Sequence, residues 1–209
     1  MVRRTPVLIV GSGSAGIFAA VWLARYNIPF TLVEKRSGPM EIGQADGVQC
    51  RTVEIYESFG LSEEVLREAY HILEVCFWGE GSHGGIERKS RAMDTQNGLS
   101  HMPHVILNQA KMNGLMLGEL ERLGRGGDVE YGWDVKGLEV DAAKVDDPDA
   151  YCCKVVAERN GNEEIFEAKY VLVSLIILSP LTVADFRGVR RRPQHRPQIP
   201  RLHHGWRHH

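Results

Sequence analysis

The N-terminal part of the chain alternates between short apolar runs and a stretch with apolar residues at helical spacing. Val7–Val10 is a continuous apolar run that ends at a glycine, and Ser14–Tyr26 carries apolar residues on one helical face. A second apolar run, Phe30–Val33, follows Asn27 and ends at Glu34. This order predicts a strand, a tight turn, a helix and a second strand, which is a βαβ unit with a parallel sheet.

The middle of the chain is less regular. Apolar spacing in Val53–Phe59 and Glu63–Glu68 predicts two short helices, and His71–Trp78 alternates loosely, as a strand does. Glu80–Gly98 is rich in glycine and charge, which favours an exposed hairpin.

A longer helix is predicted over Asn108–Leu123, where methionine and leucine residues share one helical face. Its interior glycines, Gly114 and Gly118, each cost about 1 kcal/mol relative to alanine, so we expect them to mark close packing.

Three antiparallel strands are predicted next: Val129–Val140, Cys152–Arg159 and Ile165–Lys169. Asn160-Gly161 is typical of the tight turn between the last two. A buried strand is predicted at Tyr170–Val173. The predicted fold class is therefore α/β, with a Rossmann-like parallel sheet plus antiparallel strands.

Composition changes near the C terminus. From Arg187 onward there are seven arginines and no acidic residue or lysine, and proline and histidine are frequent. We predict one domain over residues 1–178 and an unstructured segment over residues 179–209. Removing these seven positive charges from the formal net charge of −2 leaves −9, so the main body is acidic and no nucleic-acid partner is expected.

The cysteines Cys50, Cys76, Cys152 and Cys153 have no CxxC spacing, which favours neither a zinc site nor a disulfide framework. We therefore expect a reducing, cytoplasmic compartment. The apolar run that begins at Tyr170 is interrupted by serine and proline and is shorter than the ~18 residues of a spanning helix, so no membrane partner is expected. His101 and His104 lack a third ligand nearby in the sequence, so no metal site is predicted.

The strongest motif is the turn after the first predicted strand, Gly11-Ser12-Gly13-Ser14-Ala15-Gly16, which fits GxGxxG before a helix. Its glycines permit a tight turn, the approach of a pyrophosphate and close packing of helix on strand. The start of the helix, at Ser14 and Ala15, would hold the phosphates. Glu34 is placed to accept hydrogen bonds from ribose hydroxyls, which disfavours the 2′-phosphate of NADP here but leaves NAD and FAD open. A glycine turn needed only for packing is the alternative.

Three further stretches carry a family resemblance. They are Gly43–Thr52 (GQADGVQCRT), Glu34-Lys35-Arg36 and Ile106–Gln109. Together they resemble the aromatic-ring flavoprotein monooxygenases, most closely the fungal phenol 2-monooxygenases, over about residues 5–175. The resemblance implies FAD as cofactor and NADPH as reductant. It adds to the cofactor site Lys35, Arg36, Gln44, Ala45, Arg51 and Gln109.

The resemblance also implies a reaction, ortho-hydroxylation of a phenolic small molecule through a flavin hydroperoxide. Asp46 matches the acid that lies beside the substrate hydroxyl in this family, where it would orient the phenol and help to take its proton. The alternative is that Asp46 only caps a turn before Gly47. A homo-oligomer is left open.

The family pattern breaks off after Val173. The Asp-Gly pair that the resemblance leads us to expect there, and a later Gly-Asp motif, are both missing from this sequence. We therefore expect an incomplete FAD site, which leaves a non-catalytic FAD- or ADP-binding fragment as an alternative. An NAD-dependent dehydrogenase is a third hypothesis, disfavoured by the Gly43–Thr52 stretch.

Overall fold

The computed structural model describes residues 1–174 and 186–187. Helices, including the short 3₁₀ helix η1, are α1 (Ser14–Arg25), α2 (Cys50–Ser58), α3 (Ser62–Glu68), α4 (Gln109–Arg122) and η1 (Gly126–Asp128). The strands are β1 (Val2–Val10), β2 (Phe30–Glu34), β3 (Gly47–Val48), β4 (Tyr70–Ile72), β5 (Glu74–Glu80), β6 (Ile86–Met93), β7 (His104–Ile106), β8 (Val129–Tyr131), β9 (Asp134–Val140), β10 (Cys153–Arg159), β11 (Asn162–Val173) and β12 (Phe186–Arg187).

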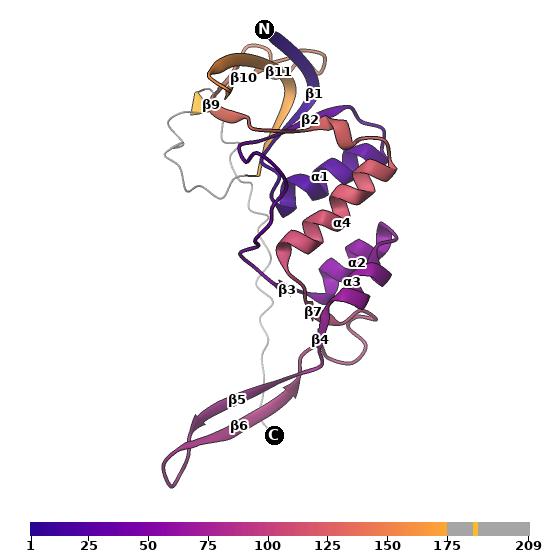
Figure 1. Ribbon diagram of the computed structural model, residues 1–209, viewed down its shortest axis with the longest axis vertical. Helices are drawn as coiled ribbons and strands as arrows, with labels where there is room; N and C mark the ends of the chain where they lie inside the picture. The colour runs from indigo at the N-terminus through magenta and orange to yellow at the C-terminus, as the bar shows by residue number, and fades with distance from the viewer. Residues whose placement is uncertain (175–185, 188–209) are drawn as a thin grey trace, which may run out of the picture.

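The main sheet has seven strands in the order β12-β9-β10-β11-β1-β2-β8. β1 is central, and β2 and β11 pair with it in parallel on either side. β9 and β10 extend the sheet as antiparallel strands beyond β11. The predicted βαβ unit and the mixed α/β class are both confirmed, and Figure 1 shows the sheet at one end of an elongated molecule.

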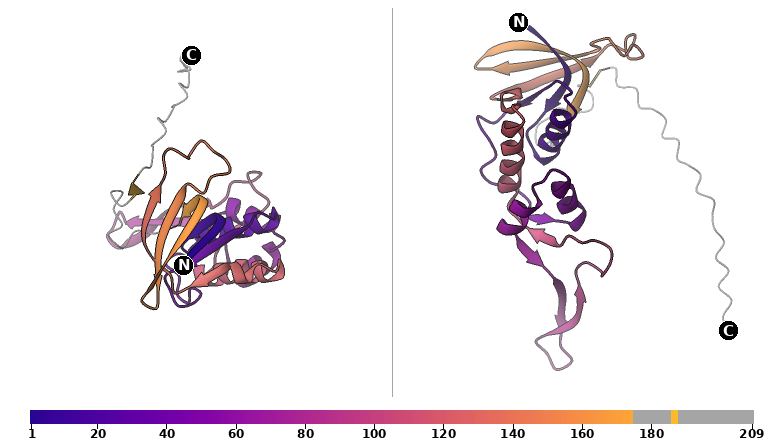
Figure 2. Two further views of the ribbon diagram at one scale, coloured as in Figure 1. Left: turned by 90° about the horizontal axis from the view of Figure 1, so that it is seen from above. Right: turned by 90° about the vertical axis from the view of Figure 1, so that its right-hand side faces the viewer.

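Hydrophobic residues pack on both faces of this sheet. On one face, Ile9 and Leu32 lie in a core with α1 and α4, which run side by side in Figure 2. On the other face, Leu8 and Val33 pack with Trp133 in a second core. Burial on both faces explains why the strand residues form continuous apolar runs in the sequence rather than alternating ones.

The far part of the molecule is built from short elements. α2 and α3 contact each other, and β3, β7 and β4 form a small three-stranded antiparallel sheet. From this sheet the β5–β6 hairpin projects away from the body in Figure 1. The hairpin predicted within Glu80–Gly98 is therefore present, with β5 as its first strand.

Two local turns confirm the sequence interpretation. Asn27 has φ of 55° just after α1, a left-handed conformation that asparagine tolerates and that ends the helix. Asn160 and Gly161 both have positive φ (54° and 78°) between β10 and β11, as a tight hairpin turn of type I′ requires.

Two predicted strands are each divided in the structure. The strand predicted at Val129–Val140 breaks at Gly132, which has φ of 82°, so β8 and β9 are separate. β8 pairs in parallel with β2, so this part of the predicted strand does not join the antiparallel strands β9 and β10. His71–Trp78 likewise spans the end of β4 and most of β5.

Two expectations about packing are wrong. A Cβ atom added at Gly114 or at Gly118 would meet nothing within 4 Å, because both glycines lie on the exposed side of α4. The strand predicted as buried at Tyr170–Val173 is the end of β11, and Tyr170 is 63% exposed and Leu172 42%. Within the described residues, the helices cover β1 and β2 and leave this end of β11 open.

The segment predicted to be unstructured, residues 179–209, lies outside the described residues apart from Phe186–Arg187. That pair forms β12 and lies parallel to β9, so the prediction does not hold at these two positions. None of the helices in the described part of the chain is long and apolar enough to cross a membrane.

Met116 tests the packing of α4 on the sheet core, because its side chain is fully buried. We expect Met116→Ala to lower the free energy of unfolding by about 2–5 kcal/mol, since the smaller side chain leaves a cavity. Urea denaturation measures the change. Lys111→Ala, an exposed change on the same helix, should stay within about 0.5 kcal/mol. Equal effects of the two substitutions would contradict this assignment of the core.

Candidate functional site

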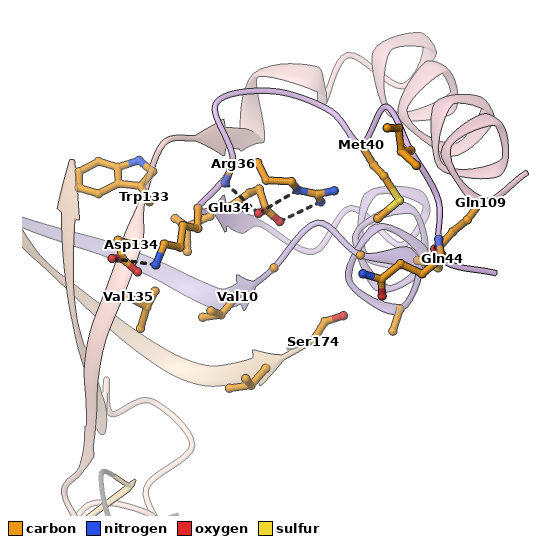
Figure 3. Close-up of a pocket in the computed structure, with 18 residues that line it drawn as sticks. Val10, Glu34, Arg36, Met40, Gln44, Gln109, Trp133, Asp134, Val135 and Ser174 are labelled. Carbon is orange, nitrogen blue, oxygen red and sulfur yellow. Dashed lines mark hydrogen bonds and ion pairs between the residues drawn. The ribbon is translucent and has the colours of Figure 1, made fainter. Parts of the chain in front are cut away.

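A cavity of about 840 Å³ opens at the carboxyl ends of β1, β2 and β11, the edge of a parallel sheet where ligands usually bind. Figure 3 shows how side chains from several elements converge on it. The lining residues are Val10, Gly11, Gly13, Ser14, Ala15, Val33, Glu34, Lys35, Arg36, Met40, Ile42, Gln44, Gln109, Trp133, Asp134, Val135, Val173 and Ser174.

The glycine turn between β1 and α1 is sterically constrained. Gly11 has φ of 101°, and a Cβ there would lie 2.6 Å from the carbonyl oxygen of Ser174. A Cβ on Gly16 would lie 2.0 Å from the carbonyl oxygen of Gly11, so only glycine lets α1 approach β1 this closely. Gly13 lines the cavity with an ordinary φ of −68°, and the missing side chain leaves room for a ligand next to its backbone.

The N-terminus of α1 points its first turn at the cavity through Gly13, Ser14 and Ala15. Gly13 is the N-cap, and among the described residues no side chain caps this end of the helix by a hydrogen bond. Uncapped N–H groups and the positive end of the helix dipole together favour an anion such as a pyrophosphate. The turn therefore fits the phosphates of a dinucleotide.

Glu34 ends β2 beside this turn and is 8% exposed. Its Oε2 accepts hydrogen bonds from the backbone N–H and the hydroxyl of Ser12, at 2.7 and 2.9 Å. Its Oε1 accepts from the backbone N–H of Arg36 at 2.9 Å and from the Arg36 Nε at 3.1 Å. Arg36 also donates to the Ser12 hydroxyl at 2.9 Å, so three residues form one closed network.

This network keeps Glu34 ionised. Burial by itself would raise its pKa, but hydrogen bonds from Arg36 and Ser12 outweigh burial and lower the pKa to about 2. The carboxylate is therefore ionised at neutral pH and can only accept hydrogen bonds. Because both oxygens already accept at least two hydrogen bonds, a ribose hydroxyl would bind Glu34 by replacing one from the Ser12 hydroxyl or the Arg36 guanidinium. The guanidinium of Arg36 balances its charge close to the glycine turn.

One end of the cavity is formed by Trp133, Asp134 and Val135, which the sequence interpretation missed. The backbone N–H of Trp133 donates to the Glu34 carbonyl at 2.8 Å and so fixes this segment next to β2. Lys35 lies at the rim and forms an ion pair with Asp134 at 3.2 Å. The available signal was Gly132, since a glycine inside a predicted strand often marks a break.

The opposite end of the cavity is formed by Met40, Gln44 and Gln109, which lie together in Figure 3. The Gln44 backbone N–H donates to Gln109 Oε1 at 2.9 Å, and Gln109 Nε2 donates to Ser14 Oγ at 3.2 Å. A Cβ on Gly43 would lie 2.5 Å from the Gln109 Cβ, so glycine allows this loop to touch α4.

Nine of the sequence-predicted cofactor residues line this cavity: Gly11, Gly13, Ser14, Ala15, Glu34, Lys35, Arg36, Gln44 and Gln109. The remaining predicted residues do not. Gly16 acts through packing, and Ala45 lies in the exposed loop after Gln44. The Arg51 side chain is 81% exposed and forms an ion pair with Glu54 at 2.7 Å.

Asp46, the predicted catalytic acid, also lies outside the cavity lining and is exposed. Its carbonyl oxygen accepts a hydrogen bond from Leu107 N–H at 2.8 Å, which joins its loop to β7. The two histidines considered as metal ligands contact separate acids, His101 with Glu57 and His104 with Asp94. No cluster of three or more metal-ligating side chains is present in the described part of the chain.

Gly16→Ala tests the close approach of α1 to β1. Because the new Cβ would collide with the backbone oxygen of Gly11, we expect a loss of about 1–3 kcal/mol in the free energy of unfolding. The matched control is Gly118→Ala on α4, where space is open and stability should rise by about 0.5–1 kcal/mol. A destabilised control, or a neutral Gly16→Ala, would argue against this geometry. Chemical denaturation measures both.

Glu34→Gln tests the buried carboxylate. Because folding lowers the Glu34 pKa from 4.5 to about 2, its stabilisation is fully present above pH 4.5 and is lost as the pH falls toward 2. We expect the variant to be less stable than the wild type at pH 7, by at most about 3 kcal/mol, and the difference to shrink between pH 4.5 and 2. Denaturation midpoints across this range measure it. Glu80→Gln, at an exposed position, is the matched control for the loss of one carboxylate.

Three relatives align with most of this chain. It is 52% identical over 177 residues to the FAD-dependent monooxygenase terD of Aspergillus terreus, with 83% of this chain and 29% of terD covered. It is 38% identical to a 3-hydroxybenzoate 4-monooxygenase of Comamonas testosteroni (81% and 27% covered). It is 27% identical to the phenol 2-monooxygenase fsqG of Aspergillus fumigatus (79% and 27% covered). The chain therefore spans less than a third of the length of these relatives.

A solved structure has the same fold. The flavin-dependent monooxygenase PieE, crystallised with FAD and substrate, superposes with a TM-score of 0.63 at 23% identity, covering 80% of this chain and 29% of PieE. The model of the FAD binding domain matches residues 4–173, which include the glycine turn, Glu34 and Gln109. This chain therefore belongs to the FAD-binding domain family of the FAD-dependent monooxygenases.

Proposed function

We propose that this chain forms the ADP-binding half of the FAD site of a monooxygenase that hydroxylates phenolic compounds. The observation that carries the proposal is the cavity in which the glycine turn, the uncapped start of α1 and the ionised Glu34 converge. Each group matches one chemical part of the ADP moiety, and the family identifies the dinucleotide as FAD.

Specific residues would hold each part of the cofactor. The N–H groups at Gly13, Ser14 and Ala15 would bind the pyrophosphate, and Glu34 would accept hydrogen bonds from the ribose hydroxyls. Because Trp133–Val135 lies next to Glu34, that end of the cavity would hold the adenine.

The end formed by Gln44 and Gln109 would then face the ribityl chain and the flavin. The family resemblance assigns Arg51 and Ala45 to this end as well, although neither lines the cavity here. Arg51 forms its ion pair on the exposed face of α2, so it would contact the cofactor only after releasing Glu54.

The bound flavin would supply oxygen activation, and the protein would position the aromatic ring. Asp46 is the residue we assign to the substrate side, since its carboxylate is exposed and its backbone is held by Leu107. A carboxylate beside a phenolic hydroxyl orients it and can accept its proton, which makes the ring more electron-rich. The names of two relatives, a 3-hydroxybenzoate 4-monooxygenase and a phenol 2-monooxygenase, support a phenolic substrate. NADPH would be the reductant.

A second function deserves a test, because the chain spans only 29% of terD. A protein with the ADP half alone would bind FAD or ADP without turnover. Binding and turnover therefore need separate measurements. The third hypothesis, an NAD-dependent dehydrogenase, is disfavoured by the family match over residues 4–173.

Titration of the purified protein with FAD, ADP and NAD tests the proposal. We expect flavin absorbance and fluorescence changes on FAD binding, competition by ADP, and at least a tenfold loss of affinity in Glu34→Ala, because the ribose hydroxyls lose their acceptor. Glu80→Ala is the control. Stabilisation by NAD without a response to FAD would contradict the proposal. NADPH oxidation stimulated by phenol then separates the monooxygenase from the fragment that only binds.

A further inference from the structure

Two side chains one turn apart on α4 reach the start of α1. Gln109 Nε2 lies 3.2 Å from Ser14 Oγ, and the Ser14 hydroxyl lies 2.9 Å from Asn113 Oδ1. Asn113 is 2% exposed and is not among the residues that line the cavity. Its Nδ2 lies 3.9 Å from the Met40 sulfur, in the loop that borders the flavin end of the cavity.

The Gln44 N–H fixes the directions of the first two hydrogen bonds that link Gln44, Gln109 and Ser14. The Gln44 backbone N–H can only donate, so the atom of Gln109 that faces it must be the oxygen, Oε1. The amide nitrogen of Gln109 then faces Ser14 and donates to its Oγ. Ser14 has a single hydroxyl proton, which it donates to the Asn113 oxygen.

Asn113 is thus the terminal acceptor of a relay that runs from the flavin end of the cavity to the phosphate-binding turn. While Asn113 accepts the Ser14 proton, Ser14 offers Gln109 a lone pair and holds its amide in the orientation that Gln44 requires. Because the Ser14 hydroxyl is bonded to Asn113, the phosphates would be bound by the backbone N–H groups at the start of α1. Without the Asn113 oxygen, the Ser14 hydroxyl would have no fixed acceptor and would be free to rotate. The Ser14 oxygen would then no longer hold the Gln109 amide in one orientation.

We propose that Asn113 is a positioning residue for the flavin half of the cofactor site, acting through Ser14 and Gln109 on Gln44. The inference rests on the proposed FAD site. ADP would contact only the glycine turn and the Glu34 end of the cavity, whereas the flavin part of FAD would also contact the Gln44 end. Asn113 therefore affects FAD and ADP unequally.

The first test compares affinities for FAD and ADP in Asn113→Leu, which removes the acceptor while keeping a side chain of similar size. We expect FAD binding to weaken about 3- to 10-fold, the effect of one hydrogen bond, and ADP binding to change by less than about twofold. Ser14→Ala breaks the same relay from the other side and should weaken FAD binding by a similar factor. The exposed Lys111→Ala on the same helix should change neither affinity. Equal losses for FAD and ADP, or unchanged FAD binding, would overturn the proposal.

A second measurement needs no ligand. Hydrogen–deuterium exchange of the Gln44 amide, which is bonded to Gln109, should accelerate in both Asn113→Leu and Ser14→Ala and stay as in the wild type in Lys111→Ala. If the wild-type protein binds neither FAD nor ADP, the proposed function fails and the exchange rates still decide whether Asn113 positions Gln44. Unchanged exchange in both relay variants would overturn the positioning role. Should Asn113→Leu fail to fold, Asn113→Ala carries both tests, and Ser14→Ala carries the exchange test.

Discussion

The contact between the start of α1 and the end of β1 is the constraint on which the cofactor end of this protein depends. The backbone oxygen of Gly11 lies where a side chain on Gly16 would be, so helix and strand meet without side chains between them. This contact aims the first turn of α1 at the cavity. Because β2 runs parallel to β1, Glu34 ends at the same edge and lies beside that turn. One steric fit thus places the N-terminus of α1 and the Glu34 carboxylate together.

A carboxylate next to the proposed phosphate site raises an electrostatic problem, since both groups are anionic. The network around Glu34 resolves it: Ser12 and Arg36 satisfy its oxygens, and the Arg36 guanidinium adds a positive charge at the same place. These donors outweigh the cost of burial and keep the carboxylate ionised. The site is consequently held by hydrogen bonds made before any ligand arrives, a form of preorganisation.

The two parts of the molecule differ in how they bury apolar surface. The main sheet is packed on both faces, whereas the projecting β5–β6 hairpin leaves Phe77, Trp78 and Ile86 at least 59% exposed. A two-stranded ribbon is only marginally stable by itself because it has no second layer to cover it. The core on the helical side of the main sheet continues through α2, α3 and β7, because Val53, Val65 and Val105 belong to the same cluster as Ile9 and Leu32. The hairpin is therefore the part that lacks a covered apolar face.

The sequence by itself determined the βαβ unit, the glycine turn and the position of Glu34, because these depend on local spacing and on what a backbone without side chains can do. It also predicted nine of the eighteen residues that line the cavity. It could not determine the pairing of β8 with β2, the Trp133 end of the cavity or the relay through Asn113. Those features join residues far apart in the chain, and only the tertiary packing of α4 and β8 against the first βαβ unit brings them within hydrogen-bonding distance.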